Sequence, residues 1–141
     1  MIIDHIGIVV KSIEKAIEHW TNVFGYHQIT EPVINSRQKV RVVFMEKTDS
    51  MQIKLVEPLD ETSPAHPFLM KGGGLHHLCF KCKNMGDEIG RLKEHRLRVL
   101  AMPQPGEAFE NEEIAFVYAK QGLNIELIET EKRANLLDKE E

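Results

Sequence analysis

Short apolar runs separated by polar turns recur along the chain at a constant step. His5 and His77 lie near the start of two such runs and are 72 residues apart, and the same step relates two further pairs of runs. The matching segments are 4–10 with 76–82, 42–45 with 114–117, and 52–57 with 124–129. Three pairs in register, with no net gap between them, indicate an internal duplication.

The first half predicts a strand, a helix and three further strands. Segment 2–10 is almost continuously apolar, as expected of a strand buried on both faces. Ser12 is a suitable N-cap for a helix with one apolar face, and Gly25 favours its end. A short strand is expected at 28–32, a polar loop at 35–39, and hairpin strands at 40–46 and 51–57.

The second half repeats this order after a proline-bearing link at 58–67 and a helical turn at 68–70. We expect a strand at 76–82, a helix capped by Asn84, a short strand at 99–101, a loop at 103–111, and strands at 112–119 and 123–130. The charged segment 131–141 is expected to form a short amphipathic helix or a frayed tail without chemistry. Each half is therefore β-α-β-β-β.

This duplication predicts one α+β domain in a chain of 141 residues. Each half has only about 60 residues and would be marginal alone, so the two modules should share one sheet or core. We place the domain at 1–130, with module 1 at about 1–60 and module 2 at about 72–130, and the charged tail at 131–141.

Composition excludes two classes of partner. A net charge of −4 argues against a general nucleic-acid binder, which normally carries a basic excess. No apolar run approaches the ~20 residues of a membrane span. The first residues enter a strand at once and leave no room for a signal peptide, so we expect a cytoplasmic protein.

Cys79 and Cys82 are the two cysteines, and their spacing does not favour a disulfide or a zinc site. On a strand, residues three apart point to opposite faces, so the two sulfurs should not meet. A zinc ribbon would also need a second cysteine pair. Cys79 shares a face with His77, and we expect it to contact the substrate.

The duplication should bring equivalent residues together around a pseudo-twofold axis. Two equivalent pairs carry metal-ligand or acid–base chemistry: His5 with His77, and Lys54 with Glu126. Strand alternation places further side chains on the same cleft face. The expected cleft-facing residues are Gly7, Arg41, Val43, Met45, Cys79, Glu113, Ala115 and Val117.

Two imidazoles and a carboxylate with open positions suit a divalent metal that binds a bidentate oxygen ligand. The alternative is that His5 and His77 are ordinary core residues. A glutamate inside the apolar run 125–128 argues against this, because an unpaired carboxylate there would be costly. His76 should face away from His77 and bond to nearby backbone.

Several motifs resemble those of the vicinal oxygen chelate superfamily, which includes glyoxalase I, extradiol dioxygenases and bleomycin-resistance proteins. The resemblance covers about residues 2–130 and is closest to methylmalonyl-CoA epimerases and small glyoxalase-like proteins. It rests on segments 4–8, 55–59 with 63–64, 74–78, 114–116 and 125–127. It implies a curved mixed sheet around a central cleft, and a homodimer.

The resemblance also implies a divalent metal (Zn, Ni, Co, Mn, Fe or Mg) held by His5, His77, Glu126 and a fourth ligand from the first hairpin. Here the fourth position is Lys54, whose ammonium cannot ligate a cation. Three arrangements are open. Gln52 could supply an amide oxygen, three protein ligands could suffice with water, or Lys54 could pair with Glu126 in place of a metal.

The function that the resemblance implies is a metal-dependent isomerase, epimerase or lyase. Such an enzyme chelates neighbouring oxygens of a small carbonyl acid or acyl-CoA thioester and moves an α-proton through an enediolate. Glu126, Glu113 and Lys54 are the catalytic candidates.

Arg41 would bind a substrate carboxylate or phosphate, although Arg41 and Glu113 could equally form an ordinary ion pair. Segment 106–113 departs from the epimerase pattern, so a lactoylglutathione lyase-like activity is also considered. The alternative function is a small-molecule-binding protein without catalysis, for sequestration or sensing.

Overall fold

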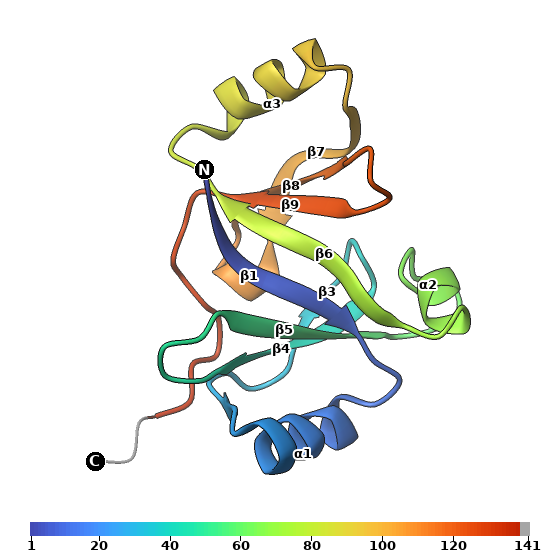
Figure 1. Ribbon diagram of the computed structural model, residues 1–141, viewed down its shortest axis with the longest axis vertical. Helices are drawn as coiled ribbons and strands as arrows, with labels where there is room; N and C mark the ends of the chain where they lie inside the picture. The colour runs from blue at the N-terminus through green and yellow to red at the C-terminus, as the bar shows by residue number, and fades with distance from the viewer. Residues whose placement is uncertain (139–141) are drawn as a thin grey trace.

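The computed structural model describes residues 1–138 and shows a single open sheet shared by the two modules (Figure 1). The strand order is β2-β4-β5-β1-β6-β9-β8-β7, with β3 pairing on β4. Module 1 contains β1 (Ile2–Val9), α1 (Ile13–Phe24), β2 (His27–Gln28), β3 (Val33–Asn35), β4 (Val40–Glu46) and β5 (Gln52–Pro58). After α2 (His66–Met70), module 2 contains β6 (Gly74–Lys81), α3 (Met85–Glu94), β7 (Arg98–Gly106), the 3₁₀ turn η1 (Glu107–Phe109), β8 (Glu112–Tyr118) and β9 (Asn124–Ile128).

The two modules meet along β1 and β6, which run antiparallel at the centre of the sheet. Ile6 pairs with Leu78, which is its own mate at the 72-residue step. The local pseudo-twofold axis therefore passes beside this pair. The neighbouring pairings repeat as well, because β1–β5 and β6–β9 are both parallel, and β4–β5 and β8–β9 are both antiparallel. The predicted duplication and fold class are confirmed.

Each of the two long helices begins at the N-cap residue that the sequence predicts, and each packs against the strands of its own module. Ser12 accepts a hydrogen bond from a backbone N–H of α1, and Asn84 does the same for α3. Gly25 ends α1 in the left-handed conformation that favours glycine. Helix α1 packs on an apolar cluster from β4 and β5, whereas α3 packs on one from β8 and β9, at opposite ends of the molecule (Figure 1).

Two predicted element boundaries are wrong, for different reasons. The strand expected at 28–32 does not form there, because β2 ends at Gln28 and β3 begins at Val33, and these two strands pair with separate parts of β4. The short strand at 99–101 extends through 98–106, and so takes in the first four residues of the expected loop at 103–111. Its prolines are tolerated because β7 is an edge strand whose outer side has no strand partner among the described residues.

The segment after β9 is neither a helix nor a frayed tail over residues 131–138. It returns to module 1 in an extended path, where Thr30 and Leu136 form a β-bridge and Leu137 N–H bonds to the Ile29 carbonyl. The last three residues of the expected tail, 139–141, lie outside the described residues. No helix within residues 1–138 combines the length and apolar character needed to cross a bilayer.

Candidate functional site

The two histidines of the duplicated strands face each other across the module interface. His5 lies opposite Cys79, and His77 lies opposite Gly7, so each imidazole sits over a small residue of the other strand. Both histidines are buried, and their ring centroids are 5.9 Å apart. A Cβ atom on Gly7 would lie only 2.0 Å from Cε1 of His77, so glycine is required by this close approach.

Replacing Gly7 with alanine tests this close approach. We expect Gly7→Ala to displace the His77 ring and to lower the free energy of unfolding by about 1–3 kcal/mol, as overpacking usually does. Gly90→Ala is the matched control, because nothing lies within 4 Å of a Cβ there on α3. That change should stabilise the helix by roughly 0.5–1 kcal/mol. Urea denaturation gives the free energy of unfolding of both variants. If Gly7→Ala has the same free energy of unfolding as the unaltered chain, the assigned packing of His77 on Gly7 is wrong.

Two β-bulges place one further side chain beside each histidine. Asp4 has no partner on β6, because Ile3 pairs with Phe80 and His5 with Cys79. His76 has no partner on β1, because Gly7 pairs with His77 and Ile8 with Leu75. The two bulged residues are mates at the 72-residue step. Bulges redirect side chains, and here each bulged residue contacts the histidine that follows it.

The prediction that His76 faces away from His77 is therefore wrong. The two Nδ1 atoms lie 2.9 Å apart, and His76 Nε2 is 3.4 Å from the Asn124 side-chain nitrogen. Regular strand alternation does not apply across a bulge. The signal in the sequence was the equivalence of His76 with Asp4, since each precedes one of the paired histidines.

Glu126 is the centre of the buried cluster. Its Oε1 lies 3.0 Å from His5 Nε2 and 3.2 Å from His77 Nε2, although the second contact is not aligned as a hydrogen bond. Lys54 Nζ donates to Oε2 at 3.2 Å and to Oε1 at 3.4 Å. The structure thus brings together the three predicted metal ligands and Lys54.

Burial and charge set the protonation of this cluster. Burial alone would raise the pKa of Glu126, but the Lys54 charge and the hydrogen bond with His5 hold it well below its usual value. Burial lowers the pKa of His77 to about 4, and it also lowers the pKa of His76. At neutral pH, Glu126 is therefore a carboxylate and the two adjacent histidines of β6 are neutral imidazoles.

The depressed pKa of His77 predicts a loss of stability in mild acid. The unfolded chain binds a proton near pH 6.5 and the folded chain only near pH 4, so stability is complete above pH 6.5 and declines between these values. We expect this group to cost about 2 kcal/mol of unfolding free energy between pH 7 and pH 5. Urea denaturation of His77→Gln should show a smaller decline. The exposed control His27→Gln should retain the full decline, and equal slopes for the two variants would refute the assignment.

Arg133 was missed by the sequence analysis, which assigned no chemistry to the last residues. It is 7% exposed, and its Nη2 donates to Asp4 Oδ2 at 2.5 Å and to Gln52 Oε1 at 3.2 Å. Asp4 Oδ2 in turn accepts from His5 Nδ1 at 2.7 Å. Gln52, the alternative fourth metal ligand, therefore has its amide oxygen engaged by a guanidinium. A single charged residue in a charged segment gives no sequence signal for this role.

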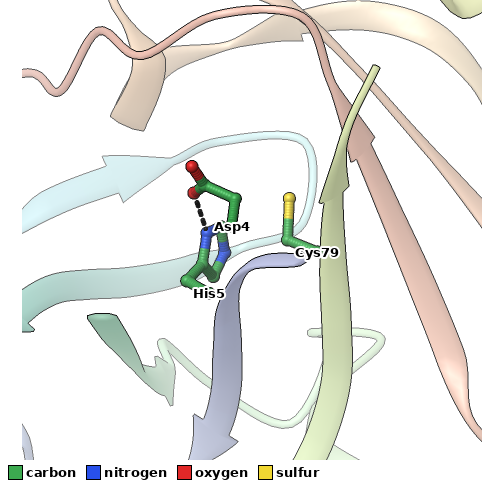
Figure 2. Close-up of side chains that lie close together, drawn as sticks. All are labelled: Asp4, His5 and Cys79. Atoms are coloured by element: carbon green, nitrogen blue, oxygen red, sulfur yellow. Dashed lines mark hydrogen bonds and ion pairs between the residues drawn. The ribbon is translucent and has the colours of Figure 1, made fainter. Parts of the chain in front are cut away.

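Cys79 lies behind the site and not at a substrate-contacting surface. It projects from β6 beside Asp4 and His5 (Figure 2), is fully buried, and belongs to the apolar core. Burial raises the pKa of its thiol. Its expected contact with substrate has no support in this placement. Cys79 and Cys82 are both free, as the strand spacing predicts.

Arg41 and Glu113 do not face the cleft, so these predictions are wrong. Arg41 binds Glu14 of α1 at 2.7 Å and Glu57 at 3.2 Å, on the face that the helix covers. Glu113 is exposed and shares the face of β8 that packs toward α3. The run 40–45 is apolar at nearly every position, so alternation could not show which face of β4 meets the cleft. The register decides it, because Val42 pairs with Val56.

A cavity of about 330 Å³ opens on this cluster. Its polar side chains come from Lys54, His76, His77, Asn124, Asn35 and Gln38. Its remaining walls are apolar and include Val40, Val42, Val56, Leu100 and Phe116. A small ligand in this space would meet an ammonium, two neutral imidazoles and three side-chain amides, with hydrocarbon around the rest of its surface.

The resemblance implies a divalent metal, and its candidate ligands fit such an ion only in part. His5, His77 and Glu126 offer ligand atoms that all lie within 4.8 Å of one another, so by type and position they form a group that could hold an ion. Lys54 is the obstacle. An ion bound to Glu126 Oε1 at about 2.1 Å would lie within about 5.5 Å of Nζ. Repulsion at that distance is roughly 6 kcal/mol at an effective dielectric constant of about 20.

The cluster also has no negative excess for an added ion to neutralise. Asp4 and Glu126 contribute two negative charges, and Lys54 and Arg133 contribute two positive charges. A divalent metal would leave an excess of two charges in a buried site. The residues present therefore do not fit the metal centre that the resemblance implies.

Relatives of this chain were found by sequence. Residues 4–116 match the Glyoxalase/Bleomycin resistance protein/Dioxygenase superfamily. The chain is 34% identical over 130 residues to the uncharacterized protein YqjC of Bacillus subtilis, covering 90% of this chain and 91% of that protein. It is 30% identical over 120 residues to an ethylmalonyl-CoA/methylmalonyl-CoA epimerase of Cereibacter sphaeroides, covering 84% of this chain and 88% of that enzyme.

Solved structures agree with the sequence comparison. Methylmalonyl-CoA epimerase from Mycobacterium tuberculosis superposes with a TM-score of 0.80 at 32% identity, covering 90% of this chain and 86% of that chain. A Streptomyces coelicolor methylmalonyl-CoA epimerase variant in complex with 2-nitronate-propionyl-CoA gives 0.82 at 25% identity, covering 98% and 99%. The chain therefore belongs to the glyoxalase/bleomycin resistance/dioxygenase superfamily, and methylmalonyl-CoA epimerases are among its relatives.

Proposed function

We propose that this chain is an acyl-CoA epimerase that removes and returns the α-proton of a small 2-substituted acyl thioester. The observation that carries the proposal is the cavity of about 330 Å³, which presents Lys54 and two neutral imidazoles to its contents. Relatives named as epimerases of ethylmalonyl-CoA and methylmalonyl-CoA, and a relative bound to an acyl-CoA ligand, support this substrate class. Metal dependence is not part of the proposal, because Lys54 stands at the expected fourth ligand position.

The cavity supplies the two requirements of enolate chemistry. A base must accept the α-proton, and a positive group must oppose the charge that develops on the thioester oxygen. A neutral imidazole at neutral pH is a suitable base, and the Lys54 ammonium is a suitable positive group. Removal of the proton moves the C–H electron pair into the enolate. A solvent water that enters the open cavity then donates a proton to the opposite face of the enolate, and the hydroxide formed takes the proton held by the imidazolium, which gives the epimer and restores the base.

We assign proton transfer to His76. It lines the cavity and is neutral because burial lowers its pKa. Its Nδ1 lies 2.9 Å from His77 Nδ1, whereas its Nε2 makes only a long contact of 3.4 Å with the Asn124 amide, so Nε2 is the nitrogen that accepts the proton. Glu126 is a weaker candidate, because it is fully buried and does not line the cavity. Lys54 then acts as the electrostatic group and not as the base.

His76→Asn should lower the rate of α-proton exchange by roughly 10²–10⁴-fold, the usual contribution of a general base. The matched control is His66→Asn, which changes a histidine of α2 that does not line the cavity. Exchange rates of the two variants in D₂O provide the measurement. If His76→Asn exchanges the α-proton at the same rate as the unaltered chain, His76 is not the base.

The function itself is tested by incubating the protein with (2R)-methylmalonyl-CoA and with ethylmalonyl-CoA in D₂O. Loss of the α-proton signal by NMR reports deprotonation, and chiral analysis of the product reports inversion. We expect both, at rates far above the protein-free control. Exchange without inversion would indicate an enolate-forming enzyme that is not an epimerase.

A second candidate function is ligand binding without catalysis. The observation that favours it is the Lys54–Glu126 ion pair, which occupies groups that a metal-dependent relative would use for chemistry. Isothermal titration calorimetry with the same acyl-CoA compounds separates the two functions. Tight binding without exchange in D₂O would support the binding protein.

A further inference from the structure

We propose that the Lys54 ammonium is the resident cation of this centre, and that it excludes a divalent metal from the cluster of His5, His77 and Glu126. Lys54 is the mate of Glu126 at the 72-residue step, and it is 4% exposed. Its Nζ contacts both oxygens of that carboxylate, at 3.2 Å and 3.4 Å. The duplication thus places an acid and a base at equivalent positions, and they neutralise each other.

The surroundings of Lys54 suit a charged amine. Its Nζ lies 5.2 Å from the ring centroid of Phe109 and 6.0 Å from that of Phe44, both within or at the range where an aromatic face attracts a cation. Both rings are buried, so the ammonium is held between aromatic carbon and a carboxylate. Movement of Nζ away from Glu126 to admit a metal would separate the ammonium from the carboxylate to which it donates.

The described residues around the cluster also leave no free ligand for a metal. His5 Nδ1 donates to Asp4, and Asp4 is bound by Arg133, so the charge of Asp4 is already opposed. Gln52 also accepts from Arg133 and is not free to replace Lys54 as a ligand. Each of the two carboxylates is thus already paired with a basic side chain before any ion is added.

Lys54 also lines the cavity, which gives the inference a chemical consequence. The ammonium is positioned to meet an anionic oxygen of a ligand directly, where a metal would do so in a metal-dependent relative. This part rests on the proposed function. The exclusion of a divalent metal does not, because it follows from the contacts of Lys54 alone.

The test measures metal binding directly. Untagged protein is analysed for metals, and the chain is then titrated with Co²⁺, whose visible absorption reports coordination by nitrogen and oxygen ligands. We expect far less than one metal per chain and no cobalt bands. Lys54→Gln should bind about one Co²⁺ per chain, at least about 100-fold more tightly than the unaltered chain. Lys39→Gln, at an exposed lysine on the other side of the hairpin, is the matched control and should not gain binding.

His77→Ala added to Lys54→Gln should abolish the gained cobalt bands, which locates the ion. The proposal is overturned if the unaltered chain binds one Co²⁺ and loses it in His77→Ala. It is also overturned if Lys54→Gln folds, as judged by circular dichroism, and gains no binding. If Lys54→Gln does not fold, the metal content and titration of the unaltered chain decide. Exchange activity that persists in EDTA supports the proposal, whereas absent activity with absent metal contradicts only the proposed function.

Discussion

Lys54→Met should lose about 3–5 kcal/mol of unfolding free energy at pH 7, one of the two largest effects that we expect from a single substitution here. The methionine has a similar volume and fits among Phe44 and Phe109, so the loss measures charge and not packing. Its cause is the Glu126 carboxylate, which is fully buried and would keep only imidazole partners. Urea denaturation monitored by circular dichroism gives the comparison.

The pH dependence of this loss of stability distinguishes a charge effect of Lys54 from a packing effect. In the unaltered chain the pKa of Glu126 is held well below 4.5, so its stabilising contribution is present above that value and is lost as the pH falls through the folded pKa. Without Lys54, the pKa of Glu126 should rise, because burial then dominates. Protonation then relieves the buried charge, and the deficit of Lys54→Met should shrink between pH 7 and pH 4. A deficit independent of pH would show that Lys54 acts through packing.

Arg133→Ala should lose about 3–5 kcal/mol, which is unusual for a residue so near the end of a chain. Arg133 is buried, donates to Asp4 and Gln52, and its guanidinium carbon lies 4.4 Å from the ring centroid of Phe44. The substitution removes this stacking contact and leaves the His5 imidazole as the remaining ion-pair partner of Asp4 among the described residues. Urea denaturation again provides the measurement.

Lys132→Ala is the control for position in the chain. Lys132 pairs with Glu112, and both side chains are about half exposed, so the loss of unfolding free energy should be much smaller than that of Arg133→Ala. Equal losses of unfolding free energy in Lys132→Ala and Arg133→Ala would indicate that the returning segment stabilises the fold as a whole and not through the Arg133 ion pair. A small loss at both positions would show that module 1 does not depend on the returning segment.

The duplication explains why so much of the site could be predicted. Once His5 and His77 were matched at a fixed step, symmetry required them to meet, and Lys54 and Glu126 had to meet by the same argument. These four residues do form one cluster. The pairing of Lys54 with Glu126 was one of three arrangements that the sequence left open, since the sequence carries no information on whether a buried amine reaches a given oxygen.

The errors arose where alternation along a strand was the only guide. On β4 and β8 both faces are apolar, so Arg41 and Glu113 were placed in the cleft, although the register puts their faces toward the helices. On β6 a bulge interrupts the alternation and turns His76 toward His77. The periodicity of a single strand predicts neither its register nor the position of a bulge, because both depend on how the neighbouring strand pairs with it.

The sequence by itself determined the duplicated fold, the helix caps and the four residues at the centre, because repeated spacing and local capping chemistry act within short segments. Only the tertiary structure decided the residues around that centre. Asp4 and His76 enter it through bulges in a strand pair, and Arg133 enters it from a segment that crosses back over the sheet. Such contacts join residues far apart in the chain, and they form because a buried charge is stable only where the fold brings it an opposite charge.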